Sequence, residues 1–167
     1  MQEMTRANLK EAFAGESQAH MKYIIFADKA EREGYPEVAR LFRAIAFAER
    51  VHATNHLRAL GGIGTTAENL ETAYGGENYE NTEMYPAFAA VAKLQEEKRA
   101  ARYIRYALEA EKIHEAMYIE AGEKVKAGQD IESAPVFVCP VCGHTAIGQA
   151  PDECPVCGLR RDKYHQF

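Results

Sequence analysis

The chain has 167 residues, 47% of them hydrophobic, a length that allows one domain with its own core and a small appended module. Acidic residues outnumber basic ones 25 to 20, which disfavours a nucleic-acid partner, because such partners require clustered positive charge. No apolar run approaches the ~20 residues of a membrane span, and the polar start lacks the features of a signal peptide, so we expect a cytoplasmic protein.

Residues 3 to about 127 have the character of helices with three interruptions. The first is Gly34-Tyr35-Pro36, and the second is the glycine-rich run 61–64 followed by a capping box at 65–68. The third, near residues 95–98, has neither glycine nor proline and is placed mainly by spacing. The predicted helices cover residues of about 3–33, 36–61, 66–95 and 97–127, with a kink at Pro86. Helices of this length are typical of an all-α four-helix bundle.

An internal repeat runs through these helices. The second and fourth helices carry the pattern Glu-x-x-His, and the helix before each carries a matching glutamate. The residues are Glu16, Glu49 and His52 in the first half, and Glu77, Glu111 and His114 in the second. Side chains three residues apart share one face of a helix, so each Glu-x-x-His pair offers an oxygen and a nitrogen ligand to one region. The chain is therefore predicted to be two similar helix pairs in tandem.

The distances of these residues from the predicted turns place their side chains at one level along the bundle. The midpoint of Glu16 and Glu49 lies beside the Gly34 break, and the corresponding midpoint in the second half lies beside the third break. Most helical glutamates face water, but small apolar residues before both Glu-x-x-His pairs indicate an inward face. This ligand set is that of ferritin-like di-iron proteins. We predict two iron ions bridged by carboxylates, with a mixed iron–zinc or a manganese pair as alternatives.

The other four histidines receive no ligand role. His20 and His56 each lie four residues after a predicted ligand and could at most support it. His144 and His165, near the C-terminus, are predicted to be surface residues.

The cysteines form a second predicted metal site. Two Cys-Pro-Val-Cys-Gly knuckles place four thiolates, on Cys139, Cys142, Cys154 and Cys157. Paired knuckles of this kind give a tetrahedral sulfur site, and in a reducing compartment they favour metal over disulfides. The motif can also bind zinc, as in a zinc ribbon. The predicted iron pair nearby in the sequence favours iron instead, and iron would make this site a one-electron carrier. The C-terminal segment holds too few apolar residues to fold without such a staple.

Together these motifs resemble the rubrerythrin family. The resemblance covers essentially the whole chain and rests on the Glu-x-x-His pairs, on Gly-Glu-Asn-Tyr-Glu at 76–80 with Thr-Glu-Met-Tyr-Pro at 82–86, and on the knuckles. It implies a ferritin-like di-iron domain over residues 1–133 and a rubredoxin-like iron domain over 134–167.

The resemblance also implies roles for particular residues. The implied ligands of the iron pair are Glu16, Glu49, His52, Glu77, Glu80, Glu111 and His114. Glu49 and Glu111 would bridge the ions. Glu80, whose counterpart in the first half is Ala19, would exchange with His52 as a ligand when the oxidation state changes. Tyr23 and Tyr85 match tyrosines that hydrogen-bond ligand carboxylates, and with Glu80 and His52 they form the implied catalytic group.

The implied activity is the reduction of hydrogen peroxide to water in defence against oxidative stress. The cysteine iron would relay electrons from an external donor, such as rubredoxin or an NAD(P)H-dependent reductase. Two alternatives remain: a ferroxidase that stores iron, and a helical adaptor whose zinc ribbon recruits a protein partner. Glu80 and the thiolate site favour peroxide chemistry over storage.

The connection between the second and third helices is short. Many family members carry a long crossover here, which must travel roughly 35 Å, whereas four or five residues reach at most ~17 Å. We therefore predict a domain-swapped homodimer, in which the first two helices of one chain pack with the last two of the other. A simple up-down-up-down monomer is the alternative.

Overall fold

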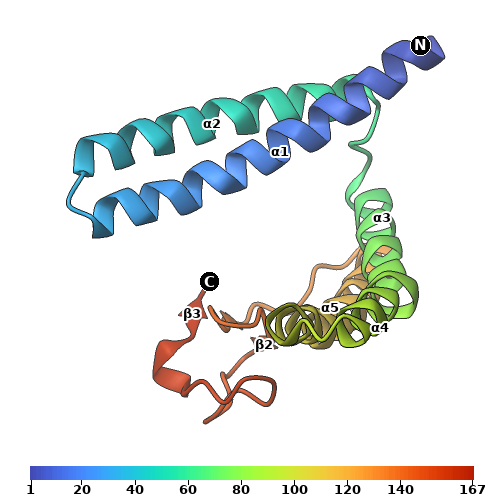
Figure 1. Ribbon diagram of the computed structural model, residues 1–167. Coiled ribbons are helices and arrows are strands. Elements are labelled where there is room, and N and C mark those ends of the chain that lie inside the picture. Colours follow the sequence, from blue (N-terminus) through green and yellow to red (C-terminus); the bar gives the residue numbers. More distant parts are fainter. The chain divides into compact units, whose positions relative to one another are not determined.

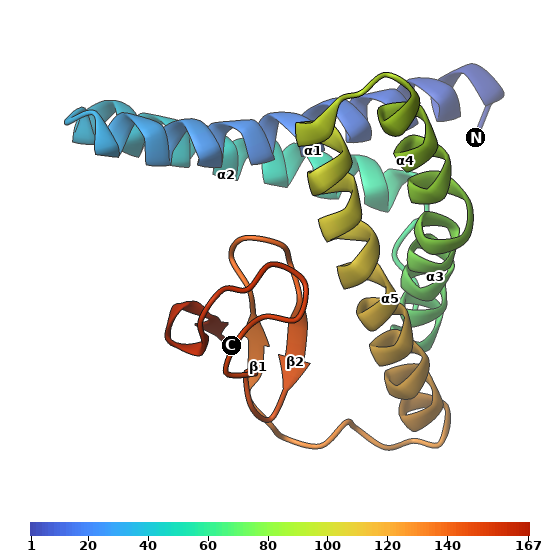
Figure 2. The same ribbon diagram turned by 60° about the horizontal axis from the view of Figure 1, so that its bottom comes forward.

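The computed structural model describes residues 1–167 and divides into two compact units, Met1–Gly64 and Thr65–Phe167. The first unit is a hairpin of two long helices, α1 (Glu3–Arg32) and α2 (Pro36–Ala59) (Figure 1). The second contains α3 (Thr66–Tyr79), the π-helical turn η1 (Glu80–Met84), α4 (Tyr85–Leu94) and α5 (Lys98–Lys126). In Figure 2, α5 runs back alongside α4 and α3. No helix is both long and apolar enough to cross a membrane.

Small residues pack the first hairpin. Ala39, Ala46 and Ala53 are the buried residues of α2, and they recur every seven residues, so they share one face. Ala27 and Ala30 are their buried counterparts on α1. The turn between the helices follows the predicted chemistry, with Gly34 at φ 83° and proline as the first residue of α2.

The predicted breaks before the second hairpin and at its turn are confirmed. Thr65 and Glu68 form the capping box at the start of α3: the Thr65 hydroxyl accepts from the Glu68 N–H, and the Glu68 carboxylate accepts from the Thr65 N–H at 2.7 Å. Between α4 and α5 the chain turns at Glu96, a non-glycine residue with φ 58°. This turn lacks glycine, which is why only spacing pointed to it.

The third predicted helix is not one regular helix. Instead of a kink in a single helix over 66–95, the structure has the π-helical turn Glu80–Met84 immediately before Pro86. Proline has no N–H, and its ring crowds the carbonyl four residues earlier. The Tyr85 N–H donates to the Glu80 carbonyl, five residues back, so the chain accommodates the proline by widening one turn.

The C-terminal segment, residues 134–167, is hereafter the cysteine module. Its three short strands are β1 (Val136–Val138), β2 (Thr145–Ile147) and β3 (His165–Gln166), arranged β2-β1-β3 with antiparallel pairing. A 3₁₀ turn covers Arg161–Lys163. The prediction of a mostly helical chain with a small C-terminal strand module is thus confirmed, whereas the boundary at 133/134 stays a prediction.

Candidate metal centres

The first predicted ligand group assembles within the first hairpin. Ligand atoms of Glu16 on α1, and of Glu49 and His52 on α2, lie within 4.8 Å of one another, and we call them the first trio. His52 Nδ1 lies 3.2 Å from Glu49 Oε2 and 3.9 Å from Glu16 Oε1. The hydrogen bond between the two carboxyls raises the pKa of Glu16 and lowers that of Glu49.

The second group assembles in the same way within the second unit. Glu77 on α3, and Glu111 and His114 on α5, also place ligand atoms within 4.8 Å of one another, and they form the second trio. Here the histidine contact is closer, with His114 Nδ1 2.6 Å from Glu111 Oε2. The two trios have the same composition in the same order, as the sequence repeat predicted.

Crowded negative charge perturbs the second trio. Burial, followed by the hydrogen bond and charge of Glu111, raises the pKa of Glu77 to about 7. The hydrogen bond between His114 and Glu111 lowers the pKa of the carboxyl and raises that of the imidazole. Carboxylates that hold each other's protons in this way are stabilised by a cation between them, and such shifts are typical of functional sites.

Glu80 and Tyr85 lie beside the second trio without belonging to it. Burial and the negative charge of Glu111 raise the pKa of Glu80. Burial raises the pKa of Tyr85, and the carboxylates of Glu80, Glu111 and Glu77 raise it further. Tyr23 has other neighbours: its ring centroid lies 6.0 Å from that of Phe42, within an aromatic cluster of the first hairpin.

The four cysteines converge as predicted. Cys139 Sγ lies 3.5 Å from Cys157 Sγ, and Cys142 Sγ lies 3.4 Å from Cys154 Sγ, with no disulfide among them. A tetrahedral thiolate site with metal–sulfur bonds of about 2.3 Å has sulfur–sulfur edges of about 3.8 Å, so only slight expansion would admit the ion.

Both knuckles have the same backbone geometry. The N–H of Gly143 donates to the Cys139 carbonyl at 2.9 Å, and that of Gly158 to the Cys154 carbonyl at 2.8 Å. The two glycines have φ of 81° and 77°, which other residues rarely adopt. Each knuckle therefore presents its two thiols on one side of a tight turn.

One thiol is prepared for deprotonation. Burial opposes the charge on Cys154, but hydrogen bonds from the Tyr164 hydroxyl and from the backbone N–H groups of Cys157 and Val156 lower its pKa to about 6. By contrast, burial raises the pKa of Cys142 well above its usual range. The thiolate is the form that binds metal, so this lowered pKa favours metal binding by Cys154.

The histidine assignments need one correction. His144 was predicted at the surface, but it is only 8% exposed and its Nδ1 lies 3.1 Å from the Tyr164 hydroxyl oxygen. It sits between the first knuckle and β2, where the fold of the module encloses it. His165 is exposed as predicted, and His20 Nδ1 bonds to the Ala46 carbonyl at 2.7 Å, tying α1 to α2. His56 lies close enough to Glu16 to lower the pKa of that carboxyl.

Two residues near the second trio were not predicted from the sequence: Thr145, which contacts His114, and Glu115, which contacts Asn78 and Asn81. Thr145 Oγ1, in the cysteine module, lies 2.8 Å from His114 Nε2. Glu115, next to His114, accepts hydrogen bonds from Asn78 and Asn81. No spacing rule connects Thr145 to α5. For Glu115, a second acidic residue directly after Glu-x-x-His was a weak signal.

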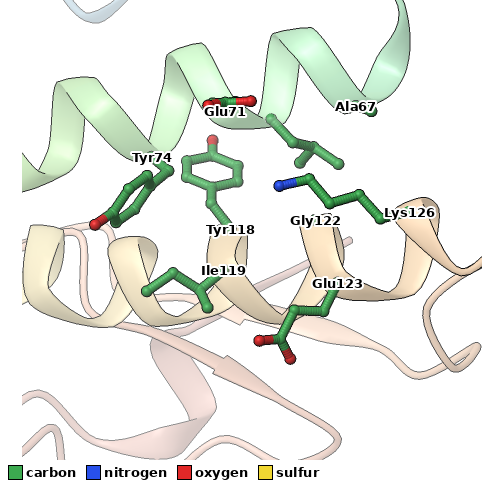
Figure 3. Close-up of a pocket in the computed structure, with 9 residues that line it drawn as sticks. Ala67, Glu71, Tyr74, Tyr118, Ile119, Gly122, Glu123 and Lys126 are labelled. Atoms are coloured by element: carbon green, nitrogen blue, oxygen red, sulfur yellow. The ribbon is translucent and has the colours of Figure 1, made fainter.

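A hollow of ≈ 310 Å³ lies between α3 and α5. Figure 3 shows the side chains that line it. It is lined by Ala67, Leu70, Glu71, Tyr74, Tyr118, Ile119, Gly122, Glu123 and Lys126. Tyr74 and Tyr118 lie one turn from Glu77 and His114, so the hollow continues the face that carries the second trio. With a lysine amine and no histidine or cysteine, its lining suits iron less well than the trio does.

The donor chemistry of the three clusters fits iron. Carboxylate oxygen and imidazole nitrogen in the trios suit a di-iron site, and four thiolates in tetrahedral array suit a rubredoxin-like iron. The charge of the trios and the geometry of the knuckles each favour a bound cation.

Comparison with known proteins gives the same result. A family model described as rubrerythrin matches residues 7–121, and one described as the rubredoxin-like domain of rubrerythrin matches residues 137–165. Rubrerythrin-2 of Clostridium acetobutylicum is 42% identical, covering 98% of this chain and 97% of its own. Nigerythrin of Nitratidesulfovibrio vulgaris is 33% identical, covering 98% and 86%. A structure of fully reduced, all-ferrous nigerythrin superposes with a TM-score of 0.59 at 31% identity, covering 98% of this chain and 86% of that chain.

Proposed function

The chain belongs to the rubrerythrin family, and from that premise we propose that it reduces hydrogen peroxide to water. Membership supports a di-iron oxidoreductase of oxidative-stress defence, and peroxide is our proposed substrate. The observation that carries the proposal is the pair of matching trios, with one extra carboxylate, Glu80, beside the second. When bound, the iron pair supplies two electrons, and the cysteine iron accepts them singly from a donor.

Proton supply is the role we assign to the protein's own side chains. Reduction of hydrogen peroxide to two waters breaks the O–O bond and consumes two electrons and two protons. Glu80 and Tyr85 lie beside the second trio, and burial raises the pKa of each in the metal-free chain. For Glu80 this shift is toward neutral pH, so its carboxyl can hold a proton and donate it to a departing oxygen, as a general acid does.

The assembly we propose is a domain-swapped dimer. Residues 60–65 join α2 to α3, and their maximum reach of about 24 Å falls short of the roughly 35 Å that a crossover requires. Large apolar side chains on α1 and α2 remain exposed, among them Phe26 at 43% and Phe47 at 57%. The first hairpin of one chain would cover the second trio and its neighbouring hollow on another chain, so that each metal pair takes ligands from both.

The test combines metal analysis with peroxide kinetics on the purified protein. We expect three iron ions per chain, ferric–thiolate absorption in the visible range, and rapid oxidation of the reduced protein by peroxide. Zinc at the cysteine site without visible absorption would instead support the adaptor, and iron uptake far above three per chain would support storage.

A matched variant separates the two sites. We expect Cys154→Ser to abolish donor-linked peroxide turnover, because the substitution removes one of the four thiolates of the cysteine site. Oxidation of the chemically pre-reduced iron pair should proceed at the parental rate. Parental donor-linked turnover in this variant would contradict the relay.

A further inference from the structure

The two Glu-x-x-His histidines are related by the repeat but lie in different surroundings. The His52 side chain is 53% exposed, and its contacts are the carboxylates of its own trio. The His114 side chain is 27% exposed and is held at both ring nitrogens, Nδ1 by Glu111 and Nε2 by Thr145. The repeat therefore gives two chemically similar ligands. Only His114 has a hydrogen-bond partner outside its trio, at its second ring nitrogen.

Hydrogen-bond directions fix what Thr145 does. Its hydroxyl lies 3.0 Å from the Gly143 carbonyl, which can only accept, so the hydroxyl proton points there. The hydroxyl oxygen is then an acceptor toward His114, 2.8 Å away, and His114 Nε2 must carry the proton. The other nitrogen, Nδ1, faces Glu111, and a metal ion bound there takes the place of its proton.

Thr145 is well anchored for this role. It is only 8% exposed and is the first residue of β2, paired with Val138. Gly143 lies against α5, where a Cβ at this position would be in van der Waals contact with the Ala110 Cβ, at 3.5 Å. Tyr106, one turn before Ala110, packs against the buried cysteines.

Through these contacts the cysteine module packs along α5. Tyr106, Ala110 and His114 are spaced by four residues and so lie in a row on one helix face. The module thereby rests on the same helix that carries two ligands of the second trio.

We propose that Thr145 is a positioning residue, through which the cysteine module holds His114 of its own chain in one tautomer and one orientation. The second trio then keeps its histidine in one orientation, whereas His52 has no hydrogen-bond partner outside its own trio. This inference rests on the metal pair assigned under the proposed function. It adds a structural difference between the two repeat-related histidines.

The test is the tautomer of His114, measured by ¹⁵N NMR of histidine-labelled protein loaded with diamagnetic zinc. In the parent and in Thr145→Ser, we expect a single Nε2-protonated form with a slowly exchanging N–H. In Thr145→Val, we expect faster exchange of the His114 Nε2–H and about tenfold weaker zinc binding at the second trio. Loss of the hydrogen-bond partner of a ligand histidine's other ring nitrogen typically weakens metal binding on this scale. Thr72→Val is the matched control, since its hydroxyl bonds only to a backbone carbonyl.

Unchanged exchange and zinc affinity in Thr145→Val would overturn the inference. Zinc retained at the four cysteines shows that the module remains folded. If valine disrupts the module, the Thr145→Ser and Thr145→Ala pair makes the same comparison. These readouts do not involve peroxide, so an inactive parent protein would overturn the proposed function alone.

Discussion

Glu80 is a carboxylate that only the second half of the repeat has, because its counterpart in the first half is Ala19. It lies in the π-helical turn beside the second trio, and burial with the charge of Glu111 raises its pKa. We expect Glu80→Ala to retain the iron pair but to slow peroxide turnover at least about 100-fold, the usual scale of acid–base catalysis. Stopped-flow oxidation of reduced protein measures this. Glu83→Ala, in the same turn and exposed, is the control, and parental turnover in Glu80→Ala would rule out this role.

Glu77 makes the stability of the metal-free protein depend on pH. Its pKa of about 7 in the folded chain exceeds its ordinary 4.5, so between these values the folded chain binds more protons than the unfolded chain. The contribution of Glu77 to stability should therefore be fully present at the acidic end of this window and be lost as pH rises through it. The raised pKa of His114 acts in the same direction.

The measurement is urea unfolding of metal-free protein across this pH range. Glu77→Gln should flatten the decline, whereas Glu71→Gln, an exposed residue on the same helix, should leave it in place. An equal decline in the parent and in Glu77→Gln would show that Glu77 does not hold the proton.

At the scale of elements, the π-helical turn is held by a contact from α5. The Glu115 carboxylate accepts from the Asn78 amide at 2.7 Å and from the Asn81 amide at 2.6 Å. The side-chain oxygen Oδ1 of Asn81 is buried without a partner, so the hydrogen bond that the Asn81 side-chain N–H group donates to Glu115 sets the position of this side chain. One carboxylate thus joins α5 to both α3 and the turn that carries Glu80.

We expect Glu115→Gln to lower the free energy of unfolding by about 1–2 kcal/mol, because one charge-assisted hydrogen bond loses its acceptor. Chemical denaturation measures the change. Glu120→Gln, exposed on the same helix, should be neutral to within about 0.5 kcal/mol. A neutral Glu115→Gln would mean that local backbone bonding alone maintains the turn.

At the scale of the whole molecule, the swapped dimer predicts complementation between two defective chains. One carries Glu16→Ala and Glu49→Ala in the first unit, and the other carries Glu77→Ala and Glu111→Ala in the second. In a swapped heterodimer, one site combines both intact halves and the other combines both defective halves. Random pairing of co-expressed chains should restore about a quarter of the parental metal pairs.

Without the swap, every site contains one defective half, and mixing restores nothing. Metal analysis of the co-purified chains distinguishes these outcomes, with each variant expressed alone as the control. Sedimentation at low concentration is a second check, because an active, folded monomer would exclude the swap.

The sequence by itself determined the helices, apart from the π-helical turn Glu80–Met84, together with their breaks and the composition of the clusters. Gly34 with Pro36, the capping box at Thr65 and the spacing around Glu96 fixed the hairpins, because turn and capping chemistry acts over a few residues. The same helical periodicity placed the glutamates and histidines of each trio on facing stripes. The two knuckles likewise needed only their own five residues.

Only the tertiary structure decided which distant groups meet. The enclosure of His144, the bracing of the π-helical turn by Glu115 and the hold of Thr145 on His114 join residues about 20 to 37 positions apart. Packing of one element on another creates such contacts, and no local periodicity encodes them. The repeat made the two trios alike, and long-range packing made them different.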